Sequence, residues 1–543
     1  YIEYSSSHHS FNKGLTVHGT HNAQITANVV YENLGHSYFL EDGGEYGNQF
    51  SNNLAINARK PSSQAAATEK ADFTNPSNYW MENGLNYFHG NHAAGSEGPG
   101  FWFDMRGLNG LSSSNNYRSQ YEAYDSKDGP QVGYFEGNTS HSIAQESLGL
   151  NHAGLVRSES HKGSDAQPQA VTVDWYIEDF TSYKVNLGIY IRGIGGNFNN
   201  IKIAEADDGT RLRLNQAISN SLIVGRTDNI GDPSAPTWSA SEGRTLPNQN
   251  GNFTGHQLYD GPAGLDNVHF AGFSGPNDYA IRESNAVHKA ATHYVNRLSF
   301  ASDVPFSHRL HYGSSFVEVK GLVDLDGSLS GTAKASLIGE LRSNNLLGRS
   351  SNGQFNQDWG ANISSDVSFG SMKLRGSELD TDNTEVTISR SDGATTGSFR
   401  VASNNEQSLF AVGGSYSYKM EFTDAPSQFQ FYVNDLPMGE GIIYEIAGLN
   451  IDSRFSVGHE AEIDLIRETS SLARLQAATS TSIFRDRPNA KLYIKFVAQM
   501  RHGWLFPQPR MTIDNKLMGG VLVNVNSSRL MEYVSIAVLS VSR

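Results

Sequence analysis

Two acidic residues, Glu41 and Asp104, each follow a short aromatic-rich run, Tyr-Phe-Leu before Glu41 and Phe-Trp-Phe before Asp104. Two carboxylates on one groove are what glycoside hydrolysis requires, one acting as the acid and the other as the base or nucleophile. Polar residues also follow strands simply because strands end at the protein surface. Glu41 and Asp104 are therefore candidate catalytic residues, with a purely structural role as the alternative.

Histidines are frequent near the start of the chain: His8, His9, His18, His21, His36, His89 and His92. A neutral imidazole can remove the proton alpha to a uronate carboxylate, as a polysaccharide lyase requires, or bind a metal ion. No HExxH or comparable ligand spacing occurs, so no metal site is predicted. His18 follows the run Gly-Leu-Thr-Val, and His36 precedes the run that ends at Glu41. These two are the candidate catalytic histidines, with a surface or stacking role as the alternative.

Four further residues are candidates for binding the substrate. Arg192 follows the run Gly-Ile-Tyr-Ile, and Arg244 lies in the phrase GRTLP. Either guanidinium could pair with a substrate carboxylate through two parallel hydrogen bonds, or form a structural ion pair instead. Asp42 directly follows Glu41, so in an extended segment the two side chains point to opposite faces. Asp260 ends the run His-Gln-Leu-Tyr, close to the position of the other candidates but one residue out of step.

A repeated phrase explains why several candidates share one position. In each repeat an apolar residue stands three places before an asparagine: Ile25/Asn28, Phe50/Asn53, Phe88/Asn91 and Phe135/Asn138. A period of about 25 residues, stretched by insertions, is typical of stacked coils and predicts a right-handed parallel β-helix. Asparagine suits a fixed corner because it tolerates the left-handed conformation and can bond to its own backbone. We expect the four apolar residues to stack inside the helix.

A second short strand ends thirteen residues after each corner, and its end residues form one predicted column: His18, Glu41, Asp104, Asn151 and Arg192. If neighbouring coils carry Glu41 and Asp104, the two lie about 5 Å apart, near the separation in retaining glycosidases. If the coil with an insertion over residues 59–82 lies between them, the separation is about 9–10 Å, at the upper end of the inverting range. Such a column predicts a long open groove. Trp102 and Tyr190, beside column members, are predicted to pack inside the coils.

The overall composition narrows the class of protein. The formal charge is −15, from 41 Lys and Arg against 56 Asp and Glu, which argues against a nucleic-acid partner because nucleic acid needs a basic face. A polyanionic glycan would likewise need a locally basic groove. There are no cysteines and no long apolar run that could span a membrane. The first residues, YIEYSSSHHSFNKG, lack the features of a signal peptide.

The pattern changes after about residue 300. Val317–Gly331 and the stretch from Ser368 to Tyr444 alternate like antiparallel strands, and strands are also expected at Lys491–Gln499 and Val521–Val525. Ala461–Ala478 has near-helical apolar spacing and predicts a helix. The chain is thus predicted to be all-β, with a parallel β-helix over residues 1–330 and one or two β-rich accessory domains over residues 331–543.

A short acidic segment resembles part of a calcium-binding loop. Asp324, Asp326 and Ser328 are spaced like the start of a calcium loop, but the closing glutamate position holds Ala335. We expect a turn there, and calcium is the only cofactor that the sequence suggests.

Five phrases resemble, in order, segments of the family of the cell-migration-inducing hyaluronan-binding protein and its transmembrane hyaluronidase relative. They are His8–Asn22, Gly35–Glu45, Ala93–Phe103, Glu242–Pro262 and Asp324–Gly331. The resemblance covers about residues 1–330 and implies an extracellular β-helix, a small G8-type domain ahead of it, and hyaluronan as ligand or substrate. The G8-type region and the first coils have no counterpart here, so the chain is expected to open partway through the helix and the missing region could contribute to the site. The vertebrate cysteines are absent, so the substrate does not transfer directly.

Together these features predict a secreted or cell-surface protein that degrades a long, uronate-containing polysaccharide such as hyaluronan, by hydrolysis or by β-elimination. The main alternative is a non-catalytic carbohydrate-binding or adhesive surface protein, because a β-helix can also serve as a rigid spacer. A component of a larger extracellular assembly is a third reading.

Overall fold

The computed structural model describes residues 1–514 except for residues 42–44, 68–69, 83, 85, 105–133, 154–175, 194–195, 213–215, 230–251, 260–262, 284–290, 313–319, 340–353, 365–368, 377–384, 394, 396–397, 401–406, 413–415, 424–427, 435–440, 449–450, 452–453, 460–461, 465–466 and 498–509. The chain forms two compact units, Tyr1–Ser284 with Val295–His311 and Asn285–Tyr294 with Tyr312–Arg543. The sequence placed the boundary near residue 330. Within the described residues, no helix is both long and apolar enough to cross a membrane.

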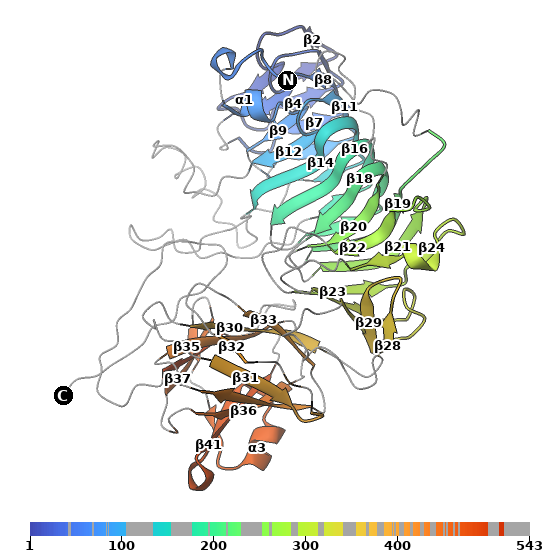
Figure 1. Ribbon diagram of the computed structural model, residues 1–543. Coiled ribbons are helices and arrows are strands. Elements are labelled where there is room, and N and C mark those ends of the chain that lie inside the picture. Colours follow the sequence, from blue (N-terminus) through green and yellow to red (C-terminus); the bar gives the residue numbers. More distant parts are fainter. Residues whose placement is uncertain are drawn as a thin grey trace, which may run out of the picture. The chain divides into compact units, whose positions relative to one another are not determined.

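The first unit is a parallel β-helix, as predicted, whose coils stack in sequence order (Figure 1). Three ladders of parallel strands run along it. Ladder 1 contains β1 (Ile2–Glu3), β4 (Gln24–Thr26), β7 (Gln49–Ser51), β10 (Tyr87–His89), β13 (Phe135–Glu136), β15 (Tyr176–Glu178), β17 (Asn197–Asn199) and the first parts of β19 (Gln216–Val224) and β21 (Ala263–Ala271).

The other two ladders follow in each coil. Ladder 2 contains β2 (Ser6–His8), β5 (Val29–Tyr31), β8 (Leu54–Ala58), β11 (His92–Ser96), the first parts of β14 (Thr139–Ala153), β16 (Thr181–Gly193) and β18 (Lys202–Leu212), the ends of β19 and β21, and β24 (Ser299–Phe300). Ladder 3 contains β3 (Leu15–Val17), β6 (Tyr38–Leu40), β9 (Tyr79–Met81), β12 (Phe101–Asp104), the ends of β14, β16 and β18, β20 (Thr254–Leu258), β22 (Tyr279–Glu283) and β25 (Leu310–His311).

Ladder 1 supplies the core that the repeat predicted. Ile25, Phe50, Phe88 and Phe135 are partners in successive strands, and each is at most 1% exposed. The rings of Phe50 and Phe88 stack with their centroids 5.0 Å apart. The prediction that these four residues stack inside one helix is confirmed.

The corner asparagines differ from their predicted role. Asn53 and Asn91 do not bond to their own backbone: each side-chain Oδ1 accepts the backbone N–H of the previous corner asparagine, at 3.0 Å. Each Nδ2 donates instead to a carbonyl of the previous coil, Ile25 or Phe50, at 2.7 Å. The left-handed conformation falls one residue earlier, for example at Asn52 with φ 53°. The asparagines therefore tie coils together, and their buried amide groups are satisfied.

Ladder 3 has two apolar faces. Tyr38, Tyr79 and Phe101 stack inside, with centroids 4.8 and 4.5 Å apart. The alternating residues Phe39, Trp80 and Trp102 form a separate buried cluster on the outer face, packed against Ala71. The prediction that Trp102 and Tyr190 are packed in a core is confirmed, but both are buried on the outer face of the ladder rather than inside the coils, Tyr190 with Leu187 and Tyr259. Trp102 lies two positions before Asp104, and Tyr190 lies two positions before Arg192. Because residues two apart in a strand share a face, both rings lie on the same face as the column.

The second unit is built mainly from antiparallel strands. β26 (Lys320–Asp324), β27 (Ala335–Gly339), β28 (Gln354–Asn356) and β29 (Ala361–Ser364) pair near its start. One sheet of the described residues contains, in order, β33 (Gln407–Val412), β30 (Phe369–Gly376), β35 (Gln428–Asn434), β42 (Arg510–Asp514), β37 (Arg454–His459) and β38 (Glu462–Asp464). Another contains β32 (Phe399–Arg400), β31 (Glu385–Arg390), β34 (Ser417–Phe422), β36 (Gly441–Ala447), β41 (Lys491–Val497), β40 (Ser482–Asp486) and β39 (Arg467–Glu468).

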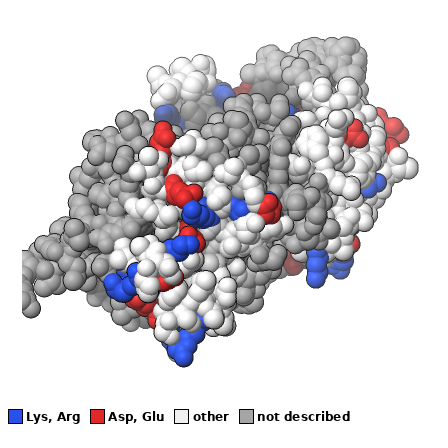
Figure 2. Space-filling model, turned by 60° about the horizontal axis from the view of Figure 1, so that its bottom comes forward, with Lys and Arg blue, Asp and Glu red and all other residues white. Residues whose placement is uncertain are grey.

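The long helix predicted at Ala461–Ala478 is wrong. Of the described residues in this stretch, only those of α3 (Leu472–Ala477) are helical, with Ser471 as the side-chain cap, while β38 and β39 occupy the earlier part. The strand predicted at Val521–Val525 lies outside the described residues. Charges in this unit pair locally, as Lys491 with Glu445 at 3.0 Å. Figure 2 shows basic and acidic side chains interspersed over the described part of one face of the molecule.

Candidate functional site

The strand register brings the predicted column together. Val17 pairs with Leu40, Phe39 with Trp80, and Met81 with Phe103, so the residues that follow occupy one position of successive coils. The column in order is His18, Glu41, Glu82, Asp104 and Asn151. The coil with the insertion lies between Glu41 and Asp104, so their backbones are two coil spacings apart, or about 10 Å.

Glu82 is the column member that the sequence interpretation missed. The run Tyr79-Trp80-Met81-Glu82 repeats the pattern Tyr38-Phe39-Leu40-Glu41. That likeness was the available signal, but the insertion before residue 79 breaks the thirteen-residue spacing from the corner at Asn53. Glu82 turns the predicted pair of acidic residues into three in successive coils.

The exposed end of the column begins with a histidine–glutamate pair. The Nδ1 atom of His18 lies 3.4 Å from Oε2 of Glu41, and the two side chains are 64% and 42% exposed. Such an exposed pair contributes only about 0–1 kcal/mol to stability. Because both side chains are exposed, a large ligand can reach them. Binding that separates the pair would cost little folding free energy.

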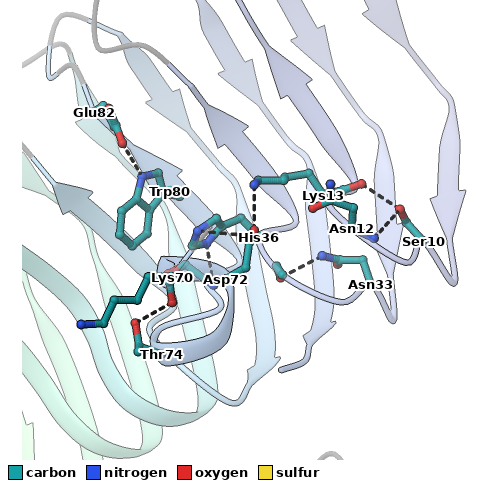
Figure 3. Close-up of polar contacts among 12 residues, drawn as sticks. Ser10, Asn12, Lys13, Asn33, His36, Lys70, Asp72, Thr74, Trp80 and Glu82 are labelled. Carbon is teal, nitrogen blue, oxygen red and sulfur yellow. Dashed lines mark hydrogen bonds and ion pairs between the residues drawn. The ribbon is translucent and has the colours of Figure 1, made fainter. Parts of the chain in front are cut away.

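Glu82 is held from the buried side of the ladder. The indole Nε1–H of Trp80 donates to Oε1 of Glu82 at 3.1 Å (Figure 3). Trp80 is buried, so this donor has a fixed position. The bond restricts the rotamers of the Glu82 side chain.

A buried charged cluster lies behind Trp80. The helix α1 (Lys70–Thr74), in the insertion between β8 and β9, brings Asp72 over ladder 3, where Oδ2 accepts a hydrogen bond from Nζ of Lys13 at 2.8 Å (Figure 3). The His36 Nε2 atom lies 3.5 Å from the Asp72 Oδ1 atom. Gly35, with φ 115°, leaves room for this carboxylate, because an added Cβ would lie 2.7 Å from Oδ1. Lys13 and Asp72 were not singled out from the sequence.

His36 is neutral in this cluster. Its Nδ1 accepts the backbone N–H of Ser77 at 3.1 Å, so the ring proton lies on Nε2, facing Asp72. Burial, with a smaller contribution from the charge of Lys13, holds the pKa of His36 well below its usual value. The ring packs between Phe39 and Trp80, with centroids 5.2 and 4.3 Å away.

The position of His36 does not suit the catalytic role predicted for it. Its side chain is fully buried, so it cannot contact a polysaccharide that binds at the exposed side chains of His18 and Glu41. We therefore count His36 among the residues that position Trp80 and, through it, Glu82.

The remaining candidates are placed only in part. Asp104 lies in β12 opposite Asn151, and Arg192 lies in β16 next to Ile191, the partner of Leu150; the side chains of Asp104 and Arg192 are not described. Asp42, Arg244 and Asp260 lie outside the described residues. Their catalytic or binding roles stay predictions.

Ladder 3 carries a second polar cluster in its later coils, which sequence interpretation also missed. Asp208 accepts hydrogen bonds from Arg211 and from Gln257. The hydroxyl groups of Tyr190 and Tyr259 lie 3.3 Å apart. Gln257 and Tyr259 belong to the family-like phrase QLYD, so these two residues of the phrase contribute to the outer face of ladder 3.

The acidic turn of the second unit is closed by its own hydrogen bonds. Asp324 accepts bonds from the backbone N–H groups of Gly327, Leu329 and Ser330 at 2.7–3.1 Å. Burial raises its pKa. Within the described residues, no group of three or more histidine, aspartate or glutamate side chains has the arrangement of a metal site. The turn matches the sequence prediction, and calcium stays a prediction.

A series of the same residue types lies on ladder 1. His89, Glu136 and Glu178 are direct partners in successive strands, followed by Asn199. The Nδ1 atom of His89 lies 3.8 Å from Oε2 of Glu136. The order histidine, glutamate, glutamate thus occurs on two ladders.

The β-helix is similar in sequence to known proteins. Residues 1–148 match the family model described as CEMIP beta-helix. The resemblance drawn from the sequence is confirmed. The chain is 28% identical over 399 residues to the mouse cell migration-inducing and hyaluronan-binding protein, an alignment that covers 61% of this chain and 29% of the relative.

Two further relatives show the range of proteins that carry similar sequence. The zebrafish cell surface hyaluronidase is 27% identical over 322 residues, or 50% of this chain and 22% of its own length. Human Fibrocystin-L is 24% identical over 349 residues, or 61% of this chain and 8% of its own length. The chain thus spans less than a third of each of these relatives.

Proposed function

We propose that this chain is part of an extracellular or cell-surface protein that cuts a long acidic glycan of the hyaluronan type within its chain. The observation that carries the proposal is the run of Glu41, Glu82 and Asp104 at one position of three successive coils. One relative is named as a hyaluronan-binding protein and another as a hyaluronidase, which supports this class of ligand.

Glu41 and Glu82 are the preferred catalytic pair. Neighbouring strands lie about 4.8 Å apart, and retaining glycosidases hold their two carboxyl groups about 5–5.5 Å apart. Glu82, fixed by Trp80, attacks the anomeric carbon while Glu41 protonates the departing glycosidic oxygen. Glu41 then removes a proton from water, which hydrolyses the glycosyl ester of Glu82 and restores both groups. His18 exchanges protons between Glu41 and solvent.

Asp104 and Arg192 are the further column residues that bind the substrate in this proposal. Asp104, one coil beyond Glu82, bonds to sugar hydroxyl groups, and Arg192 pairs with a uronate carboxylate. Glu41 and Asp104 would form an inverting pair instead, if the water that attacks the sugar sits between them in the space of about two coils.

Two alternatives have their own support. The exposed imidazole of His18 could act as the base of a lyase. A non-catalytic carbohydrate-binding or adhesive role is supported by the mouse relative, whose name gives hyaluronan binding.

A panel of hyaluronan, chondroitin and dextran separates these functions when reducing ends and unsaturated uronates are followed together. New reducing ends without unsaturated uronate support hydrolysis, and equal amounts of both indicate β-elimination. Binding without either product supports the non-catalytic role. Release of monosaccharides alone, from the chain end, would contradict cutting within the chain.

A further inference from the structure

A hollow of about 300 Å³ lies on the outer face of ladder 2, away from the column of ladder 3. It is lined by residues of β16, β18 and β19 and of the segment after β19, among them Tyr183, Lys202, Glu205, Leu222, Thr227 and Asn229. Its volume is at the lower end of the range of small-molecule sites, about 300–1,000 Å³.

The hollow exists because a stack of rings stops there. His92 contacts His141 edge to face, and His141 stacks on Tyr183 with centroids 4.7 Å apart and planes 9° apart. The partner of Tyr183 in the next coil is Ala204, so no described ring covers the other face of Tyr183. Because alanine is much smaller than tyrosine, one face of the Tyr183 ring lies beside open space.

The stack carries no charge of its own at neutral pH. Burial, with smaller contributions from His92 and Lys184, lowers the pKa of His141 to about 4. Burial also lowers the pKa of His92. Charge at the hollow therefore comes from other side chains.

The polar groups at the hollow are few and distinct. Lys202 is exposed and forms no ion pair with a carboxylate in the described part of the chain. Glu205 is buried, its Oε1 accepts the hydroxyl of Thr227, and its Oε2 has no hydrogen-bond partner among the described residues. The accessible charge at the hollow is thus positive, although the chain as a whole is acidic.

We propose that this hollow binds one sugar unit of an acidic glycan, with the pyranose ring against Tyr183 and its carboxylate paired with Lys202. A pyranose has an apolar C–H face and a rim of hydroxyl groups, which fits an aromatic wall edged by the polar side chains of Thr227 and Asn229. The class of ligand rests on the proposed function, whereas the location rests on the hollow. Because the hollow lies on another ladder, it would hold a long chain at a second point and raise its affinity through multivalency.

Isothermal titration calorimetry with a hyaluronan octasaccharide and with neutral cellohexaose tests the proposal. Tyr183→Ala should weaken octasaccharide binding by about tenfold, because an aromatic platform is lost. Lys202→Gln should weaken the octasaccharide but leave cellohexaose unchanged. The matched controls, Tyr176→Ala and Lys60→Gln at exposed positions elsewhere on the helix, should bind like the parent.

A second variant, which fills the hollow, distinguishes an effect on the site from an effect on folding. Ala204→Tyr extends the ring stack into the hollow and should itself weaken octasaccharide binding, because the hollow is filled. Adding Tyr183→Ala to this variant should cause no further loss. Glu41→Gln should lose turnover but keep this binding, which separates the hollow from the proposed catalysis. Unchanged octasaccharide affinity in both Tyr183→Ala and Ala204→Tyr would overturn the proposal, whether or not the chain cuts glycans.

Discussion

Ladders 3 and 1 of the helix present nearly the same residues on their outer faces. Ladder 3 carries His18, Glu41 and Glu82, and ladder 1 carries His89, Glu136 and Glu178, each series in successive coils. The two histidine–glutamate distances are also alike, at 3.4 and 3.8 Å. Residue type and spacing alone therefore do not distinguish a catalytic site from a polar surface without a function.

The two series differ in what lies behind them. On ladder 3, Trp80 bonds to Glu82 and packs on His36, whose ring faces the buried pair of Lys13 and Asp72. On ladder 1, no hydrogen bond joins the side-chain carboxylate of Glu178 to another described residue. Catalysis needs side chains held in place, so the supported series is the better candidate.

The largest expected effect is on turnover. Glu82→Gln should lower the rate of hyaluronan cleavage by about 10²-fold or more, because general acid–base and nucleophilic groups contribute at least that much. Glu178→Gln is the matched control and should leave the rate within about twofold, since it makes the same change on ladder 1. Equal losses in the two variants would remove the distinction between the ladders.

The next effect concerns stability at acid pH. His36 has a lowered pKa, so as pH falls below about 6.5 the unfolded chain takes up a proton that the folded chain does not. Stability is therefore lost as pH falls, by about 1.4 kcal/mol per pH unit for one such group. Denaturant unfolding between pH 7 and 5 should show a shallower loss in His36→Gln than in the parent. An unchanged slope would mean that His36 is not held neutral.

A smaller effect separates positioning from packing. Trp80→Phe keeps an aromatic ring but removes the N–H donor to Glu82, and should lower kcat by about tenfold with little change in KM, as expected for one hydrogen bond. Trp102→Phe is the control in the same buried cluster, because the Nε1 atom of Trp102 has no hydrogen-bond partner among the described residues. Similar kcat losses in both variants would show that packing alone is responsible.

The smallest effect is expected at the exposed histidine. If Glu41 and Glu82 hydrolyse the glycan, His18→Gln should reduce turnover by less than about fivefold, since an exposed pair contributes about 0–1 kcal/mol. His89→Gln serves as the control on ladder 1. Complete loss of activity in His18→Gln, together with unsaturated uronate products from the parent, would instead assign His18 as a lyase base.

The sequence predicted the helix because its inner residues are locally encoded. Ile25, Phe50 and Phe88 precede asparagines at a constant interval, and that interval survives insertions elsewhere in the coil. The same interval located Glu41 and Asp104. It failed for Glu82, because the insertion before residue 79 separates the corner at Asn53 from β9, the strand that Glu82 follows.

What the sequence could not predict depends on contacts between distant segments. Asp72 reaches Lys13 across 59 positions of the chain, and no periodic pattern marks such a pair. His36 looked like a catalytic histidine because of its neighbours in the sequence, but α1 covers it in the fold. The short helix α3 was overestimated because a few apolar residues at near-helical spacing also suit short strands.

The stereochemistry of the product tests the central claim most directly. Proton NMR of a hyaluronan oligosaccharide during the first minutes of cleavage reports the anomer that forms before mutarotation. The pairing of Glu41 with Glu82 in neighbouring coils predicts the β anomer, with the configuration of the substrate retained. An α anomer would assign the chemistry to Glu41 and Asp104, and an unsaturated product or none at all would contradict catalysis by the Glu41–Glu82 pair.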